Sequence, residues 1–152
     1  PAEEPTTKPT SKPTYKPTTS AKRPVNLVAH AGSGPADLRV QMILVGVIDP
    51  RSGALLPRAP ISPSEIVGVE FDIANIGGSS TGSWYFVATL PTGGIAYPYQ
   101  SPTQRSLAPG EHIVNVLRFS PNTRPGTISV TADPTNFVRE SNEANNAVTQ
   151  TM

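Results

Sequence analysis

Apolar and polar residues alternate most regularly between residues 67 and 74. Every second residue of this segment is apolar, and the residues between them are charged or small. The apolar positions are Val67, Val69, Phe71 and Ile73, and the positions between them are Gly68, Glu70, Asp72 and Ala74. Because successive side chains of a β-strand point to opposite faces, the segment is predicted to be an antiparallel strand with one buried face and one face in water.

Shorter apolar patterns elsewhere predict six more strands. They are bounded by turns rich in Gly and Pro, which are typical of hairpin and sandwich connections. The predicted strands cover residues 38–48, 83–90, 95–100, 112–119, 126–132 and 146–151. No segment combines a helical apolar period with helix start and stop signals. The sequence therefore predicts an all-β protein, an antiparallel seven-stranded immunoglobulin-like β-sandwich.

The N-terminal segment has a different pattern, with almost no apolar residues. Between residues 5 and 18 proline recurs at every fourth position within a repeated Lys-Pro-Thr theme. Proline fixes φ and removes an amide donor, and a segment with so little to bury cannot offset its ordering entropy. Residues 1–35 are therefore predicted to be a flexible, disordered Pro/Thr-rich stalk, interrupted by the apolar residues 25–28, ahead of one domain at 36–152.

Composition and charge limit the function classes. The 152 residues include no cysteine, which excludes a disulfide framework, a thiolate metal site and a cysteine nucleophile. No apolar run approaches the length of a membrane-spanning helix. Five cations and two acids in the first 23 residues precede seven Arg and nine acids from residue 36 onward, so the net charge of +1 combines a basic tail with a mildly acidic domain. This distribution does not favour nucleic-acid binding.

Residues 78–82 match the Gly-x-Ser-x-Gly string of a nucleophile elbow, but their surroundings do not support catalysis. A nucleophile elbow lies between a strand and a helix, whereas this segment lies between two predicted strands. The two histidines, His30 and His112, are far apart in the chain and lack metal-ligand spacing. With no convergent acid, base and nucleophile, the chain is predicted to be no enzyme and to need no cofactor, calcium being the one exception considered next.

Residues 133–146 form a long connection between two predicted strands and are rich in carboxylates and amides. Four of them offer the oxygen ligands that calcium prefers, namely Asp133, Asn136, Glu140 and Glu143. The alternative is structural: Asp133 closes an Asx-turn ahead of Pro134, and the later asparagines bond the backbone of the next strand. The spacing differs from that of an EF-hand loop, and both interpretations stay open at this point.

Two tyrosines are candidates for carbohydrate binding. Tyr97 and Tyr99 lie on one face if their segment is extended, because side chains alternate along a strand. Together with Trp84 or Tyr85 they could stack on sugar rings. The alternative is that the tyrosines pack along an edge strand and that Trp84 lies in the core, as the tryptophan of a sandwich strand commonly does.

Four segments carry a resemblance to a known family. The segments are residues 35–40, 69–77, 107–110 and 132–146, and the last of them is the most specific. In order and spacing they resemble CARDB modules, the cell-adhesion-related domains of bacterial and archaeal surface proteins. The resemblance implies an immunoglobulin- or fibronectin-III-like sandwich. It also implies a non-catalytic unit of a secreted or surface-anchored protein, in a family whose members are often repeated or attached to enzymes.

The sequence thus predicts an extracellular adhesion or spacer module that contacts a protein or a cell-surface glycan. The alternative is a carbohydrate-binding or accessory domain of a larger secreted hydrolase. Because the chain begins with Pro1 and not with Met, we expect a processed protein or a fragment of a larger polypeptide or assembly.

Overall fold

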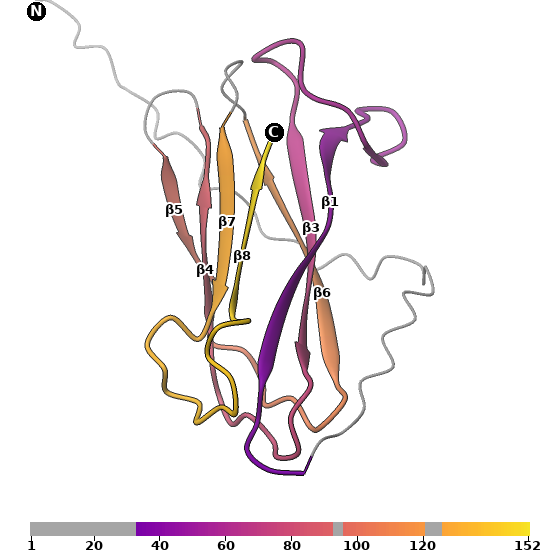
Figure 1. Cartoon of the computed structure of the whole chain (residues 1–152). Coiled ribbons are helices and arrows are strands. Elements are labelled where there is room, and N and C mark those ends of the chain that lie inside the picture. The colour runs from indigo at the N-terminus through magenta and orange to yellow at the C-terminus, as the bar shows by residue number, and fades with distance from the viewer. Residues whose placement is uncertain (1–32, 93–95, 121–125) are drawn as a thin grey trace, which may run out of the picture.

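Two four-stranded β-sheets face each other in the computed structural model of the chain, which describes residues 33–92, 96–120 and 126–152 (Figure 1). Every pair of neighbouring strands is antiparallel, and no helix occurs within these ranges. The predicted all-β sandwich is therefore confirmed. The Lys-Pro-Thr repeats lie outside the described residues, so the predicted stalk stays a prediction.

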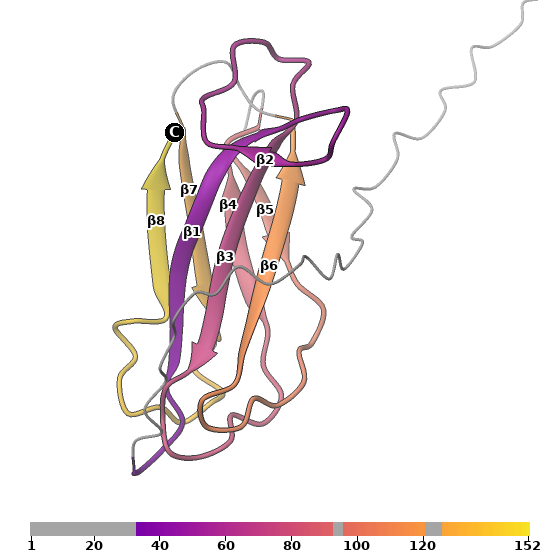
Figure 2. The same ribbon diagram turned by 90° about the vertical axis from the view of Figure 1, so that its right-hand side faces the viewer.

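The first sheet has the strand order β2-β1-β3-β6, and the second has the order β5-β4-β7-β8 (Figures 1 and 2). The strands of the first sheet are β1 (Leu38–Ile48), β2 (Leu55–Leu56), β3 (Val67–Asn75) and β6 (His112–Phe119). Those of the second sheet are β4 (Phe86–Leu90), β5 (Tyr97–Gln100), β7 (Thr127–Ala132) and β8 (Ala147–Thr151). The first sheet keeps a regular register except for a bulge in β1 between Met42 and Leu44.

The core lies between the sheets and is made by the alternating residues that the sequence places inward. Phe71 on β3 and Phe86 on β4 meet edge to face across it, with ring centroids 5.3 Å apart. Trp84 is buried and its indole Nε1 donates a hydrogen bond to the Arg105 carbonyl at 3.0 Å. The prediction that Trp84 belongs to the core is confirmed, and a Trp with its one donor satisfied packs as an ordinary core residue.

The structure has eight strands in place of the predicted seven. The additional strand is β2, whose two residues pair with Val47 and Ile48 of β1. Two residues are too short to produce a periodic pattern, so the sequence carries no signal for this strand. The segment predicted at 83–90 is regular only from Phe86 onward, and the one predicted at 95–100 only from Tyr97, with Ile95 outside the described residues.

The expectation that the second face of β3 lies in water is wrong at Asp72. This carboxylate is 1% exposed, and its Oδ1 lies 2.7 Å from Nδ1 of His112 on β6. Gly68 and Ala74 on the same face are also buried. β3 is a central strand between β1 and β6, and the space over Gly68 is filled by the side chains of Ile48 of β1 and Leu55 of β2.

Candidate interaction site at one end of the sandwich

The connection between β7 and β8 is held in one shape by Asp133. The Oδ2 atom of this buried carboxylate accepts a hydrogen bond from the Val138 amide at 2.7 Å, and the Asp133 carbonyl accepts one from the Asn136 amide at 3.0 Å. Both Asp133 and Asn136 have positive φ angles, 39° and 52°. Asp and Asn tolerate this left-handed region better than other residues with a side chain. The structural role predicted for Asp133, a hydrogen bond to nearby backbone, is therefore present. Its partner is the amide of Val138, five residues further along the chain, and not an amide within an Asx-turn.

The same connection is fastened to the start of the first strand. The two carboxylate oxygens of buried Asp37 accept hydrogen bonds from Ser141 Oγ at 2.6 Å and Asn145 Nδ2 at 2.7 Å. Glu140 accepts the Leu38 amide at 2.6 Å. The Ser141 amide donates to the Ala36 carbonyl at 2.9 Å. Residues about a hundred positions apart in the chain are therefore joined at the lower end of Figure 1.

Asn75 is the polar centre of this end of the domain. Its side chain is fully buried, and its Oδ1 accepts the amides of Asp37 at 3.1 Å and Gly77 at 3.0 Å. Its Nδ2 donates to the carbonyls of Ser79 at 2.8 Å and Leu107 at 2.9 Å. Both acceptor positions and both donor hydrogens of the amide are used. One side chain therefore joins the start of β1, the β3–β4 connection and the β5–β6 connection.

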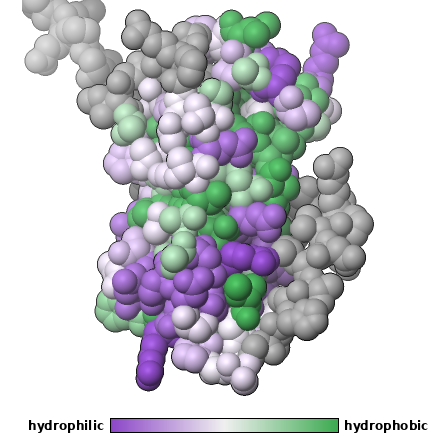
Figure 3. All heavy atoms as spheres, viewed as in Figure 1, coloured by the Kyte–Doolittle hydropathy of each residue, from purple (hydrophilic) through white to green (hydrophobic). Residues whose placement is uncertain are grey.

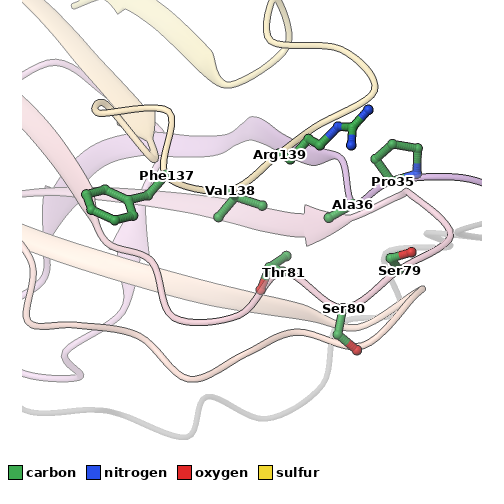
Figure 4. Close-up of a pocket in the computed structure, with 8 residues that line it drawn as sticks. All are labelled: Pro35, Ala36, Ser79, Ser80, Thr81, Phe137, Val138 and Arg139. Carbon is green, nitrogen blue, oxygen red and sulfur yellow. The ribbon is translucent and has the colours of Figure 1, made fainter.

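A shallow hollow of about 420 Å³ opens beside these fastened loops (Figure 4). It is lined by Pro35, Ala36, Ser79, Ser80, Thr81, Phe137, Val138 and Arg139. Figure 4 shows Phe137 projecting to one side of the other labelled residues, and its side chain is 86% exposed. The adjacent Val138 is buried and anchors the loop. Figure 3 shows mainly hydrophilic residues over the β7–β8 connection, so an aromatic ring in water is exceptional there.

Two of the four residues predicted as calcium ligands lie together. The Nδ2 of buried Asn146 donates to Glu140 Oε1 and to Glu143 Oε2, both at 3.1 Å, so the two carboxylates flank one amide. Asp133 instead binds the Val138 amide, and Asn136 is exposed. In the described ranges no three acidic or histidine side chains gather in an arrangement that could hold a metal ion. Calcium binding stays a prediction.

Glu140 and Glu143 are placed so that ionisation of both carboxyl groups is unfavourable. Burial raises the pKa of Glu140 to about 7, and the nearby charges of Glu143 and Asp133 act in the same direction. Hydrogen bonds from the Leu38 amide and the Asn146 side chain oppose the rise without cancelling it. A carboxyl group in such surroundings gains from a proton or a cation.

The raised pKa of Glu140 makes domain stability depend on pH. A carboxyl group whose pKa is raised by folding holds its proton more tightly in the folded state, so its contribution is fully present below about pH 4.5 and is lost as pH rises through about 7. We therefore expect the Tm of Glu140→Gln, which cannot ionise, to rise relative to that of the wild type by a few degrees as the pH increases from about 5 to about 8. The effect is limited to a few degrees because water screens a side chain that is only half buried. A Tm difference that is constant over this pH range would contradict the assignment.

The two tyrosines predicted to bind carbohydrate, Tyr97 and Tyr99, differ in how far they are exposed to water. Tyr99 is partly buried, and its ring lies 5.9 Å from that of Phe86 in the core. Tyr97 is 44% exposed at the end of β5. With Trp84 in the core, Tyr97 is the tyrosine of the pair that can more readily contact a sugar, and carbohydrate binding stays a prediction.

The Gly-x-Ser-x-Gly string lies in the connection between β3 and β4, with no helix after it in the described residues. Its central serine, Ser80, is exposed in this loop, and the preceding Ser79 donates its Oγ hydrogen to the Gly34 carbonyl at 2.7 Å. His112 binds Asp72 on the outward face of the first sheet, and His30 lies outside the described residues. The geometry is that of an immunoglobulin-like sandwich whose loops at one end are joined by hydrogen bonds.

The comparisons with known proteins define the family. The sequence model of the CARDB family matches residues 53–150. The crystal structure of the CARDB domain of the PF1109 protein from Pyrococcus furiosus, described as a complex with di-metal ions, has a TM-score of 0.53 at 24% identity, covering 80% of this chain and 90% of that one. The solution structure of the same domain has a TM-score of 0.52 at 26% identity, covering 77% and 93%. A search of curated proteins finds no match.

The chain belongs to the CARDB family, and the resemblance seen in the sequence is confirmed. CARDB is a family of non-enzymatic, adhesion-like domains that occur as modules of larger proteins. The described residues contain no helix long and apolar enough to cross a membrane.

The sequence analysis did not predict that the side chains of Asn75 and Asp37 join separate segments of the chain by hydrogen bonds. The signal for Asn75 was its position in an Asn-x-Gly strand exit, where an asparagine side chain commonly bonds nearby backbone. Asp37 gave no signal, because its partners Ser141 and Asn145 are distant in the sequence.

Proposed function

We propose that this chain is an extracellular adhesion or spacer module of a secreted or surface-anchored protein, and that the end of the sandwich around Phe137 contacts a protein partner. One observation carries the proposal: Phe137 is 86% exposed, although the loop that bears it is held by the buried Asp133–Val138 hydrogen bond. Exposed aromatic side chains held in place lose little entropy on binding and are frequent centres of protein interfaces.

The surroundings of Phe137 support a protein partner. The hollow beside it is lined by the exposed serines Ser79 and Ser80, and the exposed Arg139 lies on the same rim. An apolar anchor surrounded by polar groups and an arginine matches the composition of protein interfaces. The predicted Lys-Pro-Thr stalk would hold this end away from its point of attachment.

An adhesion assay tests the contact. Beads coated with the full chain are incubated with cells of the species that makes the protein, and we expect Phe137→Ser to reduce bead attachment at least about tenfold. Ile61→Ser is the matched control, because Ile61 is equally exposed, at 85%, but lies in the β2–β3 connection at the opposite end. Equal attachment of Phe137→Ser and wild-type beads would refute the proposed contact.

Calcium binding at Glu140 and Glu143 is a second candidate function. Two carboxylates flank Asn146, whose buried Oδ1 has no hydrogen-bond partner, and the pKa of Glu140 is raised to about 7. A divalent cation would neutralise the carboxylates and accept the free amide oxygen as a ligand.

A calcium titration followed by Tm tests this second candidate. A cation bound only to the folded state raises Tm with concentration, by an amount equivalent to about 2.7 kcal/mol at a hundredfold excess over its dissociation constant. We expect the rise in the wild type and its loss in a Glu140→Gln/Glu143→Gln double variant. Glu70→Gln, on the outward face of β3, is the control that should retain the rise. A wild-type Tm that does not respond to calcium would exclude the site.

A further inference from the structure

The strand β6 lies at one edge of the first sheet, where β3 is its one partner among the described strands (Figure 2). It has eight residues in unbroken register with β3, and it contains neither proline nor lysine. The strands at the other three sheet edges are shorter: β2 has two residues, β5 has four, one of which is Pro98, and β8 has five. Natural proteins keep edge strands short or block them with proline, lysine or a bulge. β6 is therefore the longest of the four edge strands, and it has none of these protections.

Alternate residues of β6 direct their backbone groups away from the sheet. At the end of β3, the Asn75 amide donates to the Glu111 carbonyl at 2.9 Å, and the Asn75 carbonyl accepts the Gly110 amide at 2.8 Å. Because backbone groups alternate in direction along a strand, the odd-numbered residues of β3 bond β6, and they are in register with the odd-numbered residues of β6. The even-numbered residues of β6 therefore point their amides and carbonyls toward the open edge. These residues are His112, Val114, Val116 and Arg118.

The side chains of these four residues lie on the outward face and form a nearly symmetric pattern about Asn115. Val114, which is 45% exposed, and the half-buried Val116 flank the centre, and exposed His112 and Arg118 lie beyond them. If β6 paired antiparallel with a copy of itself about Asn115, Val114 would lie opposite Val116 of the second copy. His112 would lie opposite Arg118 of the second copy. Apolar cross-strand pairs of this kind stabilise antiparallel sheets.

The charges at the two ends of such a pair are compatible. The His112 ring contacts the Asp72 carboxylate, with Nδ1 and Oδ1 2.7 Å apart. Arg118 of the second copy would therefore face a histidine–carboxylate pair and not a lone cation. The edge is thus complementary to itself in backbone, in apolar side chains and in charge, which is the requirement for a two-fold interface.

We propose that β6 is a self-association edge, at which two copies of the chain pair their β6 strands antiparallel about a two-fold axis at Asn115. The two first sheets then form one continuous sheet, and the valines of both copies form one apolar cluster on its outward face. A second copy fits this edge better than an unrelated peptide, because each β6 is already held extended by β3 and loses little backbone entropy on pairing. One strand pair is a small interface, so we expect a dissociation constant on the order of 100 µM.

This inference is independent of the proposed contact at Phe137. Phe137 lies in the β7–β8 connection, whereas the paired edge belongs to the other sheet. A dimer through β6 would therefore leave Phe137 of each copy available, and one assembly would present two such contacts.

Two measurements on the full chain test the pairing. Sedimentation equilibrium should show a dimer that forms as the protein concentration rises. Amide hydrogen exchange should locate it, because the Val114 and Val116 amides are open to water at a free edge and bonded in the dimer. With a dissociation constant on the order of 100 µM, we expect both amides to exchange about fourfold more slowly at about 1 mM chain than at about 20 µM.

A charged substitution on the edge provides the matched variant. Val116→Lys should abolish the dimer at about 1 mM chain, because it places a charge against the valines of the second copy and blocks the edge as lysine does in natural sheets. Thr149→Lys is the control and should dimerise as the wild type does. Thr149 is exposed on β8, an edge strand of the other sheet.

Three results would overturn the proposal. A chain that stays monomeric at about 1 mM would show that no second copy pairs with β6. A dimer that persists in Val116→Lys would use a different surface. Slow exchange of the Val114 and Val116 amides that does not change with protein concentration would mean that another segment of the same chain occupies the edge.

Discussion

Asn75→Ala is expected to destabilise the domain by about 3–5 kcal/mol. The substitution removes four hydrogen bonds and leaves the buried amides of Asp37 and Gly77 without an acceptor. The Leu107 carbonyl keeps its hydrogen bond from the Thr81 amide. Unsatisfied buried groups cost about 1–3 kcal/mol each, and relaxation of the loops or entry of water offsets part of the sum. The measurement is the free energy of unfolding from urea or guanidinium titration at constant m-value.

Asn142→Ala provides the comparison for Asn75. Asn142 also accepts a backbone amide, that of Ala144 at 3.0 Å, but in an exposed turn. Water can replace this bond, so its loss should cost less than about 1 kcal/mol. If the two variants lost similar amounts of stability, Asn75 would not be the polar centre that joins the loops at this end.

Asp133→Ala has the second largest expected effect, about 2–4 kcal/mol. It leaves the buried Val138 amide without its acceptor and forces alanine into a backbone with φ of 39°. The missing hydrogen bond costs about 1–3 kcal/mol and the left-handed backbone about 1 kcal/mol more. Because Asp133 holds the loop that carries Phe137, the variant should also reduce bead attachment, even under conditions where the rest of the domain stays folded.

Asp133→Asn is the conservative control. Asparagine keeps an oxygen acceptor for the Val138 amide and tolerates a positive φ, so most of the stability should be retained. If Asp133→Asn were as unstable as Asp133→Ala, the negative charge of Asp133 would stabilise the loop. The conclusion that its hydrogen bond to the Val138 amide does so would then be wrong.

The strands were predictable where one face alternates strictly. The inward residues of β3 and the bounds of β6 follow from a period of two. The two-residue β2 could not be predicted, because it forms only where Leu55 and Leu56 return beside β1. The burial of Asp72 was missed for a related reason. Alternation tells which residues share a face, whereas the exposure of that face depends on which strands flank it.

The site was less predictable than the fold. Residues 133–146 stood out by composition, and their role as an ordered connection follows from local hydrogen bonding. The contacts of Asp37 with Ser141 and Asn145 could not be inferred, because only the folded sandwich brings the start of β1 next to this connection. The exposure of Phe137 was equally hidden, since an aromatic residue in such a loop is as readily a core anchor, the role that its neighbour Val138 has.

The central claim is that Phe137 is presented by a preformed loop. Hydrogen exchange of the Val138 and Ser141 amides in the full chain tests it most directly, because these amides bond Asp133 Oδ2 and the Ala36 carbonyl. We expect both to exchange at least about a hundredfold more slowly than amides in an unstructured chain. Exchange of both at the unstructured rate, while the amides of β3 stay protected, would contradict the claim.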